Sequence, residues 1–122
     1  MTGSLLKEAE GYLNLAAGIV VEIDADLIVR FINERGCLIL EASKEEIIGK
    51  NWFDHFLPGD KRAEMKALFV ALFQTPGRPI QKLETTVLTK KGNTRFISWY
   101  NTIIKEEKGR IPAILGLGED IT

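Results

Sequence analysis

Nucleophilic catalysis by this chain would depend on its single histidine, His55, and on its single cysteine, Cys37. A catalytic cysteine needs a neighbouring base and a third group that orients the base. A predicted short helix separates the two residues, which leaves a pair open, but no Gly-x-Ser-x-Gly motif is present. A buried cysteine that serves packing is the simpler interpretation. We therefore predict no catalytic residue and no enzyme activity in this chain.

The sequence also contains no motif for binding a metal ion or a phosphate group. A zinc site would have to take nearly every ligand from aspartate and glutamate, and no acidic cluster has the spacing of known zinc sites. The sequence also lacks a glycine-rich phosphate-binding loop. We predict no metal site.

Several polar and aromatic residues could instead bind a small molecule. Ligand pockets are mostly apolar and carry a few polar groups that fix the ligand's orientation. The polar candidates lie in or beside predicted strands, where a register error of one residue moves every side chain to the opposite face. The predicted pocket set is Asn33, Cys37, Trp52, Phe56, Leu68, Leu72, Thr85, Ser98, Tyr100, Asn101 and Ile114.

The segment 31–57 would position these residues as a bent cap. Ser43 and Glu46 have the spacing of a capping box, which predicts a short helix beginning there. Gly49 can adopt the left-handed conformation that ends a helix. Large apolar side chains follow at once, with Trp52 and Phe53 first. A backbone that turns repeatedly while it presents such side chains predicts a cap over a sheet.

The remaining pattern predicts an α+β fold with about five antiparallel strands. Strands are predicted at 19–23, 28–32, 83–89, 94–105 and 111–121, and Gly92 supplies the turn between the third and fourth. One long helix over 60–74 repeats Met65, Leu68, Phe69 and Leu72 on one face and should form a pocket wall. Residues 1–17 predict a separate amphipathic helix before a domain at 18–122.

Two apolar surfaces predict a homodimer. The strand 94–105 is apolar on both faces, and Ile97, Trp99 and Ile103 would need a cover if they faced water. The N-terminal helix is the other surface. The predicted interface comprises Leu5, Ala9, Tyr12, Leu13, Ile97, Trp99 and Ile103. Packing of the N-terminal helix on its own domain is the alternative.

Composition excludes several classes of partner. The 122 residues carry a net charge of −1, which gives no basic surface for nucleic acid. The apolar run 15–21 is too short to span a bilayer, and the N-terminus is no signal peptide. One cysteine permits no intramolecular disulfide, which favours a reducing compartment such as the cytoplasm.

The ordered motifs resemble a PAS domain. They are IVRFIN ending at Asn33, SKEEIIGKNWFDHFLPGD, a Lys-Gly turn, TRFISWYNTII and the final Asp120-Ile121-Thr122, together covering residue 18 to the end. The resemblance implies the sensory module of a bacterial signalling protein, such as a sensor histidine kinase or a diguanylate cyclase. Family members usually carry glycine where this chain has Leu27, so we expect a turn without positive φ there.

The resemblance also suggests possible cofactors and a site at the end of the domain where a signal could leave it. The sequence around Cys37 does not match the Asn-Cys-Arg motif of flavin photoadducts. Haem bound through His55, and non-covalent FAD held by Trp52, Trp99 and Asn101, stay open beside a pocket with no cofactor. In the family, the residues matching Asp120 and Thr122 fix the exit toward a downstream module, so the chain can be a fragment. The alternatives are a ligand-free docking module and, more weakly, a small enzyme.

Overall fold

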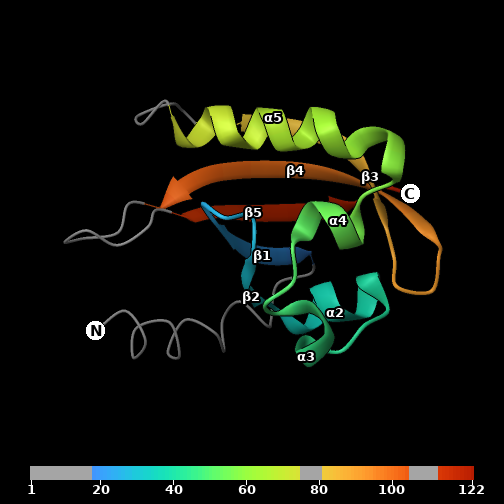
Figure 1. Cartoon of the computed structure of the whole chain (residues 1–122). Helices are drawn as coiled ribbons and strands as arrows, with labels where there is room; N and C mark the ends of the chain where they lie inside the picture. The colour runs from blue at the N-terminus through green and yellow to red at the C-terminus, as the bar shows by residue number, and fades with distance from the viewer. Residues whose placement is uncertain (1–17, 75–80, 105–112) are drawn as a thin grey trace.

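The computed structural model describes residues 18–74, 81–104 and 113–122. Their centre is a five-stranded antiparallel sheet in the order β2-β1-β5-β4-β3 (Figure 1). The strands are β1 (Ile19–Asp24), β2 (Val29–Ile32), β3 (Gln81–Leu88), β4 (Thr94–Ile104) and β5 (Ala113–Asp120). The predicted α+β class and the strand positions are confirmed. The predicted N-terminal helix lies outside the described residues.

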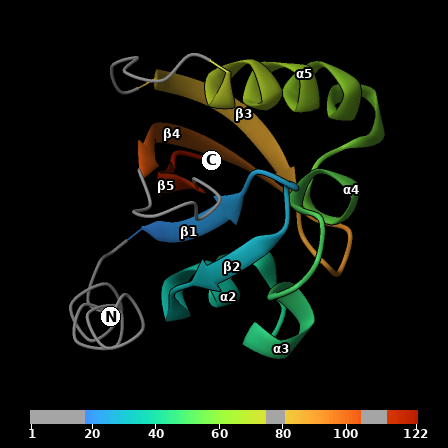
Figure 2. The ribbon, with the colours of Figure 1, turned by 60° about the vertical axis from the view of Figure 1, so that its left-hand side comes forward.

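Short helices and one longer helix cover one face of this sheet. They are α2 (Glu34–Leu40), α3 (Lys44–Ile47), α4 (Trp52–Phe56), the 3₁₀ turn η1 (Gly59–Lys61) and α5 (Arg62–Phe73). In Figure 2, α5 lies near β3, α2 and α3 lie near β2, and α4 lies between them. The side chains on the covered sheet face and on these helices form the main hydrophobic core.

Polar side chains at the helix starts explain why the cap bends. Asn33 accepts the Gly36 N–H at 2.9 Å, and Asn51 accepts the N–H groups of Phe53 and Asp54. Ser43 accepts the Glu46 N–H while Glu46 accepts the Ser43 N–H, so the predicted capping box is confirmed. Each cap satisfies backbone donors that a helix leaves unpaired. The chain can therefore start a new helix every few residues.

The turn between β1 and β2 corrects one sequence expectation, because Leu27 has a φ of 67°. A left-handed conformation costs a non-glycine residue about 1–2 kcal/mol. The Leu27 N–H donates to the Asp24 carbonyl at 2.9 Å, and its own carbonyl accepts the Trp52 N–H at 3.0 Å. The leucine side chain is buried in the core. These contacts offset the strain and fix the start of α4.

Candidate functional site

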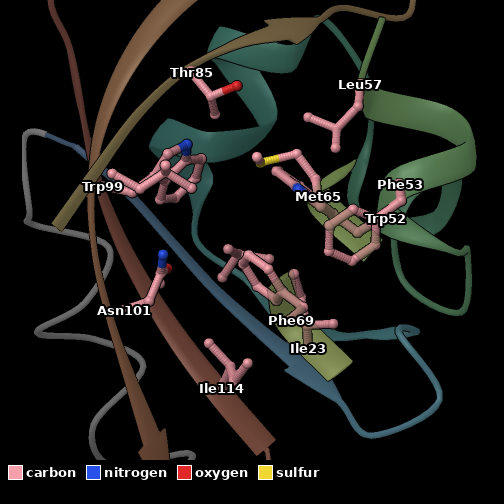
Figure 3. Close-up of a pocket in the computed structure, with 13 residues that line it drawn as sticks. Ile23, Trp52, Phe53, Leu57, Met65, Phe69, Thr85, Trp99, Asn101 and Ile114 are labelled. Carbon is pink, nitrogen blue, oxygen red and sulfur yellow. The ribbon is translucent and has the colours of Figure 1, made fainter. Parts of the chain in front are cut away.

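A cavity lies between the covered face of the sheet and helices α4 and α5 (Figure 3). Its volume is about 20 Å³, enough for roughly one water molecule. The lining residues come from β1, α4, the segment after α4, α5, β3, β4 and β5. They are Val21, Ile23, Trp52, Phe53, Leu57, Met65, Phe69, Leu83, Thr85, Trp99, Asn101, Ile114 and Gly116.

Among the described lining residues, Asn101 and Thr85 are the two with an amide or hydroxyl side chain, and none is charged. Asn101 is only 5% exposed. Within the described part of the chain, neither side chain makes a hydrogen bond, and no fully buried polar side-chain atom lacks a partner, so the polar atoms of these two residues stay accessible to a water-sized probe. Figure 3 shows them on either side of Trp99, Thr85 on β3 and Asn101 on β4. An accessible amide can form hydrogen bonds with a water or a ligand bound in the cavity.

Two glycines on β5 let the Trp99 indole lie across that strand. Trp99 pairs with Gly118 and Asn101 pairs with Gly116. A Cβ atom on Gly118 would lie 2.7 Å from Trp99 Cζ3, and one on Gly116 would lie 3.0 Å from Asn101 Oδ1. The other side of the indole meets Trp52 edge to face, with ring centroids 5.9 Å apart. Trp99 therefore connects α4 to the backbone of β5.

Beyond Gly118, β5 ends in a hydrogen-bonded turn at Asp120 and Thr122, the two residues predicted to form the exit. Asp120 Oδ1 accepts the Thr122 N–H at 3.0 Å and the Thr122 hydroxyl at 2.5 Å. The same hydroxyl oxygen accepts the Phe96 N–H of β4 at 2.9 Å. The second carboxylate oxygen of Asp120 pairs with Arg95 at 2.9 Å. The turn thus fastens the end of β5 to the start of β4.

This sheet, cap and terminal turn agree with the sequence comparison. The family model described as PAS fold matches residues 13–122. The chain belongs to the PAS family. Such domains are sensory modules, and the described residues of this one contain no helix with the length and apolarity needed to cross a membrane.

Solved PAS domains share this fold over most of their length. One from a Colwellia psychrerythraea protein has a TM-score of 0.81 at 19% identity, covering 97% of this chain and 98% of that one. A PAS domain from a two-component sensor histidine kinase has a TM-score of 0.78 at 12% identity, and the match covers 98% of this chain and 99% of that one. The PAS domain of the Cronobacter turicensis RpfR quorum-sensing receptor, in complex with BDSF, has a TM-score of 0.71 at 21% identity, and the match covers 88% of this chain and 96% of that one. The same domain has also been solved in complex with C12:0. No curated protein matches the chain in sequence.

The structure brings four of the predicted pocket residues of this PAS domain to the cavity: Trp52, Thr85, Asn101 and Ile114. Phe56, Leu68 and Leu72 pack in the core outside the lining. Four others lie elsewhere. The Asn33 side chain accepts a hydrogen bond from the Val20 N–H and donates one to the Gly18 carbonyl. Cys37 lies in a surface groove. Ser98 and Tyr100 point to the opposite sheet face.

Sequence reasoning missed six lining residues and expected Met65 and Phe69 only as a helical pocket wall. Trp99 was named as a possible FAD contact but was otherwise assigned to the interface. The missed residues are Val21, Ile23, Phe53, Leu57, Leu83 and Gly116. Alternation along β4 was the available signal for Trp99, because residues two apart in a strand share a face. Asn101 was already a pocket candidate. Trp99 therefore had to face the pocket whenever Asn101 did.

The assignment of Ile97, Trp99 and Ile103 to an interface is corrected by their burial. Ile97 is fully buried, Trp99 is 5% exposed, and Ile103 packs against the core. The helices of the same PAS domain cover this face, so a partner is not needed to shield it. Among the described side chains of β4, the large apolar ones with substantial exposure are Phe96 and Tyr100, on the opposite face. Leu5, Ala9, Tyr12 and Leu13 lie outside the described residues.

Cys37 and His55 line two different surface grooves and are not brought together in either. Burial raises the pKa of the Cys37 thiol above its ordinary value, which disfavours the nucleophilic thiolate. His55 is exposed on α4, with Nδ1 3.0 Å from the Asn51 carbonyl oxygen, and does not line the cavity. A haem ligand in that cavity therefore cannot come from His55 in this arrangement. No group of three metal-binding side chains occurs among residues 18–74, 81–104 and 113–122.

The acid dependence of the exit turn follows from the pKa of Asp120. Burial by itself raises this pKa, but hydrogen bonds from Thr122 and the nearby Arg95 outweigh it and lower the pKa below its ordinary value of 3.8. A lowered folded-state pKa contributes stability that is complete above pH 3.8 and is lost as pH falls through the folded-state value.

We expect Asp120→Ala to cost about 1–2 kcal/mol at neutral pH, because it removes these hydrogen bonds. The difference between variant and wild type should shrink below pH 3.8 as the wild-type carboxylate is protonated. Urea unfolding of both proteins at neutral and acidic pH measures the two differences. An equal difference at both pH values would exclude a charged Asp120 as the source of the stabilisation.

Proposed function

We propose that this PAS domain is the sensory input module of a larger signalling protein. The domain would bind a small molecule in the cavity between the sheet and helices α4 and α5. The observation that carries the proposal is the buried residue Asn101, which lines the cavity and whose amide makes no hydrogen bond to another described residue. The cavity is far smaller than ordinary ligand pockets of about 300–1,000 Å³. Binding would therefore push apart α4, α5 and the Trp99 indole, and so change the structure.

The proposed signal passes from Trp99 to the exit turn. The indole lies against Gly118, two residues before Asp120, and Ile97 pairs with Asp120 across β4 and β5. A ligand can shift an equilibrium only if it binds the two states unequally. A displaced indole would supply this difference, because Gly118 has no side chain that could absorb the movement.

The solved PAS domain from a two-component sensor histidine kinase supports such a kinase as the parent protein. A cyclic-dinucleotide enzyme is the alternative, which the family resemblance of the sequence suggests. Either would place a separate output module after Thr122. The domain itself would have no catalysis. A single cysteine, without a partner for an intramolecular disulfide, fits a cytoplasmic location.

The sensory proposal is tested with whatever molecule the purified protein retains. A native mass spectrum and an absorption spectrum are recorded, and the small molecules released on denaturation are returned to stripped protein. We expect an added mass, and an altered hydrogen-exchange rate of the Phe96 and Thr122 amides when the fraction is returned. Binding with unchanged exit amides would contradict signal transfer, and a protein without any retained mass or colour would favour docking instead.

A second function, dimerisation or docking, is favoured by the outer sheet face. Four large apolar side chains are exposed there: Phe96 by 39%, Tyr100 by 48%, Leu117 by 45% and Ile121 by 40%. Tyr100 and Leu117 are direct cross-strand neighbours, and Phe96 lies two pairs along the same face, beyond the pair Ser98 and Glu119. Monomers rarely expose a large apolar patch without a use for it. We propose that a second copy of the chain packs on this face.

Leu117→Lys should weaken such a dimer at least about tenfold, because it places an unpaired charge in an apolar contact. Sedimentation equilibrium over a concentration series measures the dissociation constant. Leu38→Lys is the matched control, because Leu38 is 69% exposed on α2, away from the outer sheet face. A monomeric wild type, or an equal loss in both variants, would rule out this interface.

A further inference from the structure

The charges around the cavity restrict what it can bind, if it acts as the sensory site proposed above. Among the residues that the structure describes, no lysine, arginine, histidine, aspartate or glutamate lines it. A carboxylate or ammonium group placed there would lose its hydration and meet no opposite charge, which is costly in an apolar interior. The lining therefore selects against ligands that are ionised when bound.

The Asn101 side chain restricts the ligand's polar group further. A carboxamide offers two N–H donors and one carbonyl acceptor, so it pairs best with a group that both accepts and donates. Gly116 lies opposite Asn101 and leaves room beside the amide oxygen, where a Cβ atom would come within 3.0 Å. Thr85 lies on the far side of Trp99, so Asn101 is the polar contact at its end of the cavity (Figure 3).

The remaining walls fit an apolar body. Four of the lining residues are aromatic: Trp52, Phe53, Phe69 and Trp99. Met65 reaches in from α5, and an unbranched thioether can change rotamer to make room for a ligand. A ligand with a single ring or a short chain could then occupy the space that the Met65 side chain now fills.

We propose that the ligand is a small, uncharged, mainly apolar molecule with one polar group that pairs a carbonyl with an adjacent N–H or O–H. Primary carboxamides and protonated carboxylic acids have this chemistry, because their donor and acceptor lie on the same side. Asn101 is the residue that selects it. An ionised acid of the same shape is rejected because the site supplies no cation.

Three probes with the same ring and a different substituent separate these features: benzamide, benzoate and toluene. Both tryptophans of the chain line the cavity, so indole N–H resonances and tryptophan fluorescence report binding there. At neutral pH we expect benzamide to bind at least about tenfold more tightly than benzoate and than toluene. Lowering the pH should strengthen benzoate binding, because the neutral acid then becomes available.

Asn101→Leu keeps the side-chain shape and removes its hydrogen bonds. It should weaken benzamide binding about tenfold and leave toluene binding unchanged. Ser98→Ala is the matched control, because Ser98 is buried on the same strand but faces away from the cavity. The wild-type ratio of benzamide to benzoate tests the proposal even if Asn101→Leu fails to fold.

Equal binding of benzamide and benzoate, or benzamide binding that a folded Asn101→Leu protein retains, would overturn the proposal. Either result leaves the sensory function standing, because the cavity still binds a ligand. If none of the three probes moves an indole resonance up to its solubility limit, both the ligand class and the inner cavity as a sensory site are contradicted.

Discussion

Trp99→Ala is expected to lower the free energy of unfolding by about 3–5 kcal/mol, the range for removing a large aromatic side chain from a core. Trp99 is 5% exposed and contacts Trp52 edge to face across the cavity. Truncation would leave a void between α4 and β5 that these elements cannot fill without moving. Urea unfolding followed by circular dichroism measures the loss, because the variant also removes a fluorophore.

The neighbouring residue provides the control for Trp99. Tyr100 is 48% exposed on the opposite face of β4, so Tyr100→Ala should cost less than about 1 kcal/mol. The same pair separates core from interface, since Tyr100→Ala should weaken dimerisation while Trp99→Ala acts through folding. A stable Trp99→Ala protein that has lost only its dimer would show that Trp99 belongs to an interface after all.

Gly118→Ala should destabilise the domain by about 1–3 kcal/mol, the usual range for an overpacked core. The new methyl group would lie 2.7 Å from Trp99 Cζ3 and 2.8 Å from Ile97 Cγ2, both far inside van der Waals contact. Relief requires the indole or the β5 backbone to shift. We therefore also expect the Phe96 and Thr122 amide resonances to move, because the exit turn begins two residues later.

Gly59→Ala is the matched control, since a Cβ atom on Gly59 meets nothing within 4 Å. A double-mutant cycle identifies the cause of the Gly118 effect. Trp99→Phe removes the ring carbons that would clash, so the Gly118→Ala cost should be smaller in that background. An identical cost in both backgrounds would mean that Trp99 and Gly118 are not coupled, and the proposed route to the exit would lose its first step.

The sequence determined the elements of this fold because their signals are local. The Ser43–Glu46 capping box, the hairpin glycine Gly92 with its φ of 90°, and the Asp120–Thr122 turn each depend on residues a few positions apart. Strand periodicity is equally short in range. These features alone predicted a five-stranded sheet with a bent helical cap, and the structure has both.

Leu27 shows why local reasoning fails at some positions. Its type argues against a left-handed φ, yet the structure holds it at 67°. The offsetting contact is the hydrogen bond from Trp52, a residue 25 positions further along the chain. No pattern around the turn itself contains that information.

Only the tertiary structure decided which face of β4 became the pocket. Both of its faces are apolar in sequence, with Ile97 and Trp99 on one and Phe96 and Tyr100 on the other, so alternation cannot choose between them. The choice was made by β5, where Gly116 and Gly118 leave space on one face for the amide of Asn101 and the indole of Trp99. Helices α4 and α5 then close over that face. A ligand site assembled from separate elements depends on such long-range packing, which residue type and spacing along one strand do not encode.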